Sequence, residues 1–440
     1  MKYTNTLKVE SITFSELLQY NLKIPEYQRP YTWTFKEINK LQFQFIEHQE
    51  REETDKPNFY LGSIVLHKDG EKYNIIDGQQ RITTMQILDL IKNQNTFNIS
   101  YTHPISFNRI KENFEFYKDK ELSFPCLGSI NVTVVITDSE DIAYNFFETL
   151  NTGGKRLGGT DILKAYHLRG IKENAKRNCY ALKWEKNQKN LEKVNRAISK
   201  IRRMDYFNED DLIPRKSTND DEWKNILTDD FAARTKKQDK DIGYSFVLSD
   251  DTSHTITSAK YAVRQPINEG INYINYLMGF TEEYNFLFEI KDNNDQYSDF
   301  TSKVINFIDG TEYLKHFYEL SLLCFVNRFG RENILEFSLY LFRVVYSLRL
   351  NHLERIQEST VLNFMKEKKL LDRIINAFTY DEILTYLKEF KLNIKPENIT
   401  GGVKERFYNR ICRFFNNCIS KENYDKELFL AIESYLNTTK

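Results

Sequence analysis

The residues of this chain best suited to chemistry lie in one short polar run, Asn74-Ile-Ile-Asp-Gly-Gln-Gln-Arg-Ile-Thr83. An apolar, strand-like segment precedes the run, and a stretch with helical periodicity follows it. Asp77-Gly78 should turn the chain sharply, which places the N–H groups of residues 79–82 at a helix N-terminus. Unpaired donors and the helix dipole favour an anion there, so the sequence predicts a phosphate-handling loop.

The side chains of this run support the same chemistry. Asp77 can hold a divalent cation or orient a water molecule, and the Arg81 guanidinium suits phosphate oxygens. The amides of Gln79 and Gln80 can both donate and accept hydrogen bonds. The alternative is a common Asp-Gly turn followed by a solvated helix start. Two neighbouring motifs favour the ligand-binding interpretation.

The first of these motifs is Lys23-Ile-Pro-Glu-Tyr-Gln-Arg-Pro-Tyr-Thr-Trp33, which its two prolines should hold as an extended loop. Thr34 and Glu37 then form a predicted capping box at a helix start. Aromatic faces beside an arginine and an amide suit a planar base or a nucleic-acid backbone. We expect four residues to sense DNA: Tyr27, Gln28, Arg29 and Tyr31. In the alternative interpretation, the loop aromatics, Trp33 among them, only anchor the loop.

The second motif is the glycine-rich segment Asn151-Thr-Gly-Gly-Lys-Arg-Leu-Gly-Gly-Thr160, between two predicted helices. Its glycines let the backbone approach a ligand closely. It is not a Walker loop, because Lys155 is followed by Arg156 and not by Ser or Thr. A helix C-cap followed by a turn is the alternative interpretation.

Together, the three motifs resemble the N-terminal domain of GmrSD-type modification-dependent restriction proteins, which belongs to the ParB/sulfiredoxin-like superfamily. The resemblance covers about the first 175 residues, and the matching segments are 24–33, 77–84, 147–157 and 161–165. It implies a nucleotide pocket on the D-G-Q-Q-R loop, nucleoside triphosphate hydrolysis and a role in bacterial defence against foreign, often modified DNA.

The expected site follows from the motifs and the resemblance. The nucleoside triphosphate should lie against Gly78, Gln79, Gln80 and Arg81, with Asn151, Gly153 and Gly154 closing the other side. Asp77, Gln80 and Arg81 are the expected catalytic residues. Asp77 should also bind Mg²⁺ or another divalent cation, since oxygen ligands suit that ion. Phosphoryl transfer depends mainly on positioning and charge neutralisation.

One feature departs from the family pattern. Many relatives carry a C-terminal His-Asn-His nuclease domain or work with a separate subunit that has one. The seven histidines of this chain are scattered and form no such signature. We therefore expect a separate nuclease subunit as a partner, with DNA, including modified phage DNA, as the target. Two alternatives stay open: a non-hydrolysing DNA sensor that recruits a nuclease, and a chain that is itself an endonuclease.

Composition limits the remaining choices. The chain has 440 residues and a net charge of −1, so DNA contact must come from a local basic patch. Five widely spaced cysteines fit a reducing compartment, and the N-terminal sequence lacks an apolar signal core. We expect a cytoplasmic protein with no membrane span. Homo-oligomerisation stays open.

The predicted fold class is α+β, with a small ParB/sulfiredoxin-like N-terminal domain followed by a larger helical region. The predicted domains are a nucleotide-binding domain at 1–175, a charged connection at 176–259 and a helical domain at 260–440. Residues 171–204 hold eleven Lys or Arg against three Glu. This segment is either a DNA face or a helix face that pairs with the acidic run 205–230. A further basic cluster contains Lys404, Arg406, Arg410 and Arg413, as phosphate contacts or plain surface charge.

Overall fold

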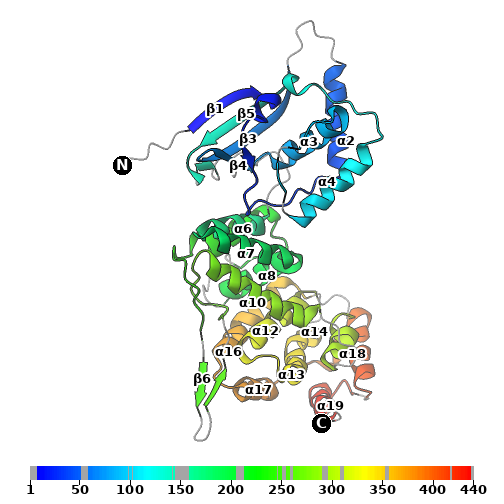
Figure 1. Ribbon diagram of the computed structural model, residues 1–440. Helices are drawn as coiled ribbons and strands as arrows, with labels where there is room; N and C mark the ends of the chain where they lie inside the picture. The colour runs from blue at the N-terminus through cyan, green and yellow to red at the C-terminus, as the bar shows by residue number, and fades with distance from the viewer. Residues whose placement is uncertain are drawn as a thin grey trace. The chain divides into compact units, whose positions relative to one another are not determined.

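Figure 1 shows the computed structural model of the protein, and the chain forms two compact units, Met1–Leu157 and Gly158–Lys440. The structure describes residues 7–50, 58–97, 99–101, 103–140, 142–143, 158–204, 213–244, 246–249, 254–257, 261–289, 296–307, 312–351, 356–416 and 419–437. The first unit combines a sheet with helices and the second is mostly helical, which confirms the predicted α+β class. The finer division at residues 175 and 259 stays a prediction.

The first unit is built on a five-stranded mixed sheet with the order β1-β5-β3-β4-β2. Its strands are β1 (Leu7–Thr13), β2 (Leu22–Lys23), β3 (Phe59–Asp69), β4 (Lys72–Asp77) and β5 (Ile130–Thr137). β1 pairs with β5 and β3 with β4 in antiparallel fashion, whereas the β3–β5 and β2–β4 pairs are parallel. The sequence pattern predicts strands at residues 7–12, 59–67, 72–76 and 131–137, and all four are present as β1, β3, β4 and β5. The two-residue strand β2 was not predicted.

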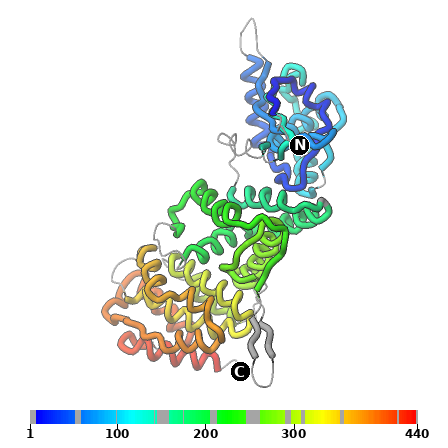
Figure 2. Tube along the Cα trace, turned by 90° about the vertical axis from the view of Figure 1, so that its left-hand side faces the viewer, coloured from blue at the N-terminus to red at the C-terminus, as the bar shows by residue number. Residues whose placement is uncertain are grey.

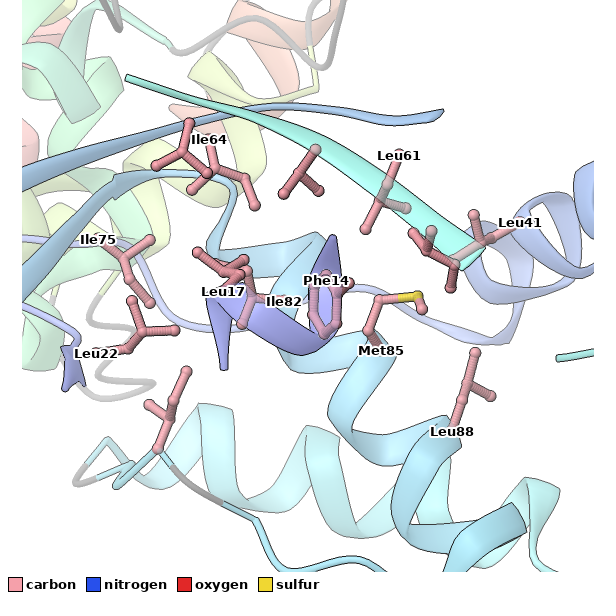
Figure 3. Close-up of a cluster of buried hydrophobic side chains, with 14 of the residues drawn as sticks. Phe14, Leu17, Leu22, Leu41, Leu61, Ile64, Ile75, Ile82, Met85 and Leu88 are labelled. Atoms are coloured by element: carbon pink, nitrogen blue, oxygen red, sulfur yellow. The ribbon is translucent and has the colours of Figure 1, made fainter. Parts of the chain in front are cut away.

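Helices cover one face of this sheet (Figure 1). They are α1 (Phe14–Leu17), α2 (Phe35–Gln49), α3 (Gln79–Asn93) and α4 (Pro104–Tyr117). The predicted capping box is confirmed, since Thr34 and Glu37 cap the start of α2 reciprocally. In the core, Ile64 and Ile75 from the sheet lie against Ile82 and Met85 of α3 (Figure 3). The buried apolar face of α3 therefore fixes where its N-terminus meets β4.

The second unit is a stack of helices (Figures 1 and 2). Its longer helices are α6 (Gly159–Gly170), α7 (Asn174–Lys186), α8 (Leu191–Arg203), α9 (Asp220–Thr228), α10 (Ile271–Phe288), α12 (Glu312–Phe329), α13 (Ile334–Tyr346), α15 (Glu358–Lys368), α17 (Tyr380–Glu389), α18 (Gly402–Phe414) and α19 (Tyr424–Asn437). A hairpin of β6 (Phe246–Ser249) and β7 (His254–Thr257) interrupts the helical pattern and was not predicted. Within the described ranges, no helix is both long and apolar enough to span a lipid bilayer.

Two basic residues of α8 are paired with carboxylates inside the second unit. Arg196 binds Asp220 at 2.8 Å, and Arg203 binds Asp229 at 3.0 Å and Asp230 at 2.8 Å. These three carboxylates belong to the acidic run that follows α8 in sequence. For these two arginines, the structure supports the pairing interpretation of the basic segment.

Candidate functional site

The strand–turn–helix predicted for the D-G-Q-Q-R run is present. β4 ends at Asp77, Gly78 has a left-handed φ of 98°, and α3 begins at Gln79. A Cβ atom at Gly78 would lie 2.9 Å from Cγ1 of Ile64, which is too close. The turn therefore requires glycine for its backbone conformation and for its packing against β3.

The start of α3 leaves backbone donors without partners. The first helical hydrogen bond runs from the N–H of Ile82 to the carbonyl of Gly78 at 2.9 Å, and no side chain caps the helix. The N–H groups of Gln79, Gln80 and Arg81 make no hydrogen bond to any residue that the structure describes. Such a set of donors at the positive end of a helix dipole suits an anion.

Arg81 is held in a defined position beside these donors. Its Nη2 donates to Oδ2 of Asp77 at 3.0 Å and to the carbonyl of Ser63 at 2.6 Å, and Nη1 donates to the carbonyl of Leu61 at 3.4 Å. Of the five N–H donors of a guanidinium, these bonds use three and leave two. The side chains of Arg81 and Asp77 are 24% and 23% exposed, so a ligand can reach the pair.

The strand β3 makes room for this guanidinium. Gly62 has a φ of 113°, next to an irregularity in the β3–β5 pairing, and its missing side chain leaves space for Nη1 of Arg81. The Tyr60 hydroxyl lies near the Arg81 guanidinium and donates to Oγ1 of Thr133 at 3.0 Å. Hydrogen bonds with Ser63 and Thr133 lower the pKa of Tyr60, and the charge of Arg81 adds to this effect. Gly62 and Tyr60 are not among the site residues predicted from the sequence, although a glycine inside a strand often marks a close approach of another group.

The two glutamines differ sharply, although both are buried. The Oε1 of Gln80 accepts from the N–H groups of Thr32 at 2.9 Å and Trp33 at 3.2 Å, and its Nε2 donates to the carbonyl of Pro30 at 3.0 Å. Gln80 therefore fastens the proline-rich loop to α3. Its side-chain amide has little capacity left for a ligand.

Gln79 makes no comparable bonds. Its side chain is only 5% exposed, and its Oε1 is buried without a hydrogen-bond partner. Buried amide oxygens are nearly always hydrogen-bonded in native proteins, so an unpaired one points to a bound water or ligand. Gln79 is therefore the better candidate of the two glutamines for ligand contact.

Two polar residues of the proline-rich loop serve its attachment to the fold. Nε2 of Gln28 donates to the carbonyl of Ile75 at 3.0 Å and also to that of Ile76, at the end of β4. The Tyr31 ring is fully buried, and its hydroxyl bonds with Oγ1 of Thr84 at 2.8 Å. Burial raises the pKa of Tyr31 to about 12. These contacts match the anchoring interpretation, and the DNA-sensing role of both residues stays a prediction.

The other two expected DNA-sensing residues lie in different surroundings. Tyr27 is buried. Arg29 is partly exposed and makes no ion pair or hydrogen bond with the part of the chain that the structure describes. The positive charge of Arg29 is therefore available to bind an external phosphate.

The remaining expected site residues have no described structure. Asn151, Gly153 and Gly154 lie outside the described residues, so their predicted role in closing the pocket stays a prediction. Within the described ranges, no three His, Cys, Asp or Glu side chains are grouped as a metal site. Any divalent cation at Asp77 would have to share its coordination with water or phosphate oxygens.

Comparison with known families assigns both parts of the chain. Residues 11–168 match the family described as the GmrSD restriction endonuclease N-terminal domain, and this region is a GmrSD-type N-terminal domain, as the three motifs predict. Residues 176–401, more than half of the chain, match a second family. The chain belongs to this second family, which is described as a family of unknown function (DUF7834). No curated protein matches the chain.

Proposed function

We propose that the first unit binds and hydrolyses a nucleoside triphosphate at the start of α3, as part of a GmrSD-type restriction system that acts on foreign DNA. The observation that carries this proposal is a set of hydrogen-bond donors without partners at the N-terminus of α3. The backbone N–H groups of Gln79, Gln80 and Arg81 have no partner among the described residues. The guanidinium of Arg81 has two further N–H donors that make no hydrogen bond with a described residue. The family match supports the link to restriction.

The geometry suggests how the chemistry is divided. Phosphate oxygens accept from the helix N-terminus and from Arg81, whose ion pair with Asp77 keeps the guanidinium oriented. Oδ1 of Asp77 makes no hydrogen bond with a described residue, so it is available to hold Mg²⁺ or to orient a water molecule. When bound, Mg²⁺ would neutralise charge on the phosphates.

The glutamines take separate roles in this proposal. Gln79 accepts a hydrogen bond from the ligand through its unpaired Oε1, and Gln80 positions the proline-rich loop beside it. Arg29 extends the positive charge of the site toward DNA. The separate nuclease partner is part of the same proposal, because the chain shows no His-Asn-His signature.

The Asp77–Arg81 ion pair also favours a second candidate function. The guanidinium of Arg81 engages Oδ2 of Asp77 at 3.0 Å, so this oxygen is already occupied and does not contact an attacking water. The unit would then bind nucleotide as a structural effector and recruit a nuclease without hydrolysis.

Phosphate release from each of the four nucleoside triphosphates tests both candidates, with and without modified phage DNA. Hydrolysis that is lost in Asp77→Ala and in Arg81→Ala supports the main proposal. Nucleotide binding without phosphate release supports the second candidate. Unchanged turnover in both purified variants would remove this site from the reaction.

A further inference from the structure

A groove of about 340 Å³ lies on the second unit, along α18 and beside the turn that follows the π-helical segment Thr301–Ile305. Three arginines of α18 line it, Arg406, Arg410 and Arg413, which are four and three residues apart and so share one helix face. No acidic residue lines the groove among the residues that the structure describes. The groove is therefore strongly positive in a chain whose overall charge is −1.

Two of these charges have no partner among the residues that the structure describes. Arg406 and Arg413 are exposed, and their guanidinium groups make no hydrogen bond or ion pair with any described residue. In contrast, Arg196 and Arg203 of the other basic segment are paired with carboxylates. Free guanidinium groups on a groove wall suit phosphate oxygens, which they bind in bidentate fashion.

The third arginine, Arg410, stacks on an aromatic ring that lines the groove. Nε of Arg410 donates to the carbonyl of Lys303 at 2.6 Å, and its Cζ lies 3.8 Å from the ring centroid of Phe307. The Phe307 side chain is nevertheless 65% exposed. The stacked guanidinium holds the ring in place, so an external planar group can stack without ordering a mobile side chain.

We propose that this groove binds single-stranded DNA, with phosphates on Arg406 and Arg413 and a base stacked on Phe307. Positive grooves with exposed aromatic rings bind single strands in this way, because every unpaired base offers a face for stacking. A base inside a duplex is already stacked on its neighbours and cannot use Phe307. That the strand is DNA rests on the proposed restriction function, although the groove belongs to the other unit of the chain.

Fluorescence anisotropy with a labelled oligothymidylate of about 12 nucleotides tests the proposal on the full chain. The Arg406→Ala/Arg413→Ala double variant should flatten the slope of log affinity against log salt by about 1.4, since each phosphate contact on a single strand contributes about 0.7. At about 0.1 M salt this corresponds to roughly 25-fold weaker binding. Phe307→Ala should weaken binding by about tenfold and leave the slope unchanged.

A matched control removes the same charge elsewhere on the second unit. Arg331 is exposed and lies 4.3 Å from the ring centroid of Phe286, and Lys391 is also exposed. The Arg331→Ala/Lys391→Ala double variant should bind oligothymidylate like the wild type. Thermal unfolding of each variant shows whether the fold is retained.

Four results would overturn the proposal: no binding of oligothymidylate by the wild type, equal binding by the groove and control variants, tighter binding of a duplex of the same length, or equal binding of an oligoglutamate of the same charge. Nucleotide titration of the same variants distinguishes failure of the groove proposal from failure of the proposed nucleotide site. Groove variants that keep full nucleotide affinity but lose oligothymidylate support the groove. Absence of nucleotide binding by the wild type, with oligothymidylate binding retained, would contradict only the proposal for the α3 site.

Discussion

Arg81 contacts the backbone of β3 where Gly62 lacks a side chain: a Cβ atom at Gly62 would lie 2.2 Å from Nη1 of Arg81. The guanidinium therefore depends on a glycine nineteen positions earlier in the chain, in a different element. Because Arg81 also binds Asp77, this contact fixes the charge arrangement at the start of α3.

Gly62→Ala should displace the guanidinium and weaken nucleotide binding by about 10-fold to 100-fold, the value of a charge-assisted hydrogen bond. Gly70→Ala is the matched control, since Gly70 also has a positive φ, of 62°, but a Cβ atom there would meet no described atom within 4 Å. Both variants carry backbone strain, which is larger at Gly62 because its φ of 113° lies outside the left-handed helical region that contains the φ of Gly70. Thermal unfolding of both variants therefore accompanies the binding measurement. Equal nucleotide affinity in the two variants would show that the position of Arg81 is unimportant.

Gln80→Ala should loosen the proline-rich loop, because it removes the acceptor for the N–H groups of Thr32 and Trp33 and the donor to Pro30. We expect a loss of about 2–4 kcal/mol in local stability. Hydrogen exchange of a peptide covering residues 30–33 measures this directly. Protection equal to that of the wild type would contradict the clamp assigned to Gln80.

Gln79→Met should change nucleotide affinity without lowering stability, in contrast to Gln80→Ala. It replaces a buried amide whose Oε1 has no partner with an apolar side chain of similar length, so the melting temperature should stay unchanged or rise slightly. Nucleotide affinity should fall about tenfold, the effect of losing one hydrogen bond that Oε1 accepts from a hydroxyl or N–H group of the nucleotide or from a metal-bound water. A stability loss without any change in affinity would assign Gln79 to the fold alone.

The second unit should respond to pH through Glu283. Burial raises the pKa of this carboxyl from 4.5 to about 8, and its Oε2 has no hydrogen-bond partner. Because the folded-state pKa lies above the unfolded value, the contribution to stability is full below about pH 4.5 and is lost as the pH rises through 8.

Glu283→Gln should therefore stabilise the protein at pH 9 by on the order of 1–3 kcal/mol more than at pH 5. The exposed neighbour Glu282 provides the control, since Glu282→Gln should have little effect at either pH. Thermal unfolding at the two pH values measures both variants. A Glu283→Gln effect that does not depend on pH would contradict the burial of this charge.

The sequence predicts the local elements of the site well. Asp77-Gly78 and the change from strand to helix period are enough to predict a strand, a turn and α3, because these signals act over a few residues. The capping box at Thr34 is predictable for the same reason. In the second unit, the apolar periodicity of residues 361–377 predicts one helix, but Lys369, with a left-handed φ of 47°, divides it into α15 and α16 (Leu370–Asn376).

The features that the sequence does not predict depend on distant contacts. Gln79 and Gln80 look solvated in sequence, and their burial follows only from the way the proline-rich loop and α3 pack. The space at Gly62 depends on the pairing of β3 with β5. Likewise, the pairing of Arg203 with Asp230 joins residues 27 positions apart, and charge counts alone cannot show it.

Isothermal titration of a non-hydrolysable nucleoside triphosphate with Mg²⁺ into the full chain tests the central claim most directly. The account predicts one binding site per chain in the wild type and no detectable heat of binding in Arg81→Ala. It also predicts wild-type affinity in the groove variant Arg406→Ala/Arg413→Ala. The absence of binding by the wild type to all four triphosphates, or equal affinity in Arg81→Ala, would contradict the assignment of the α3 N-terminus as a nucleotide site.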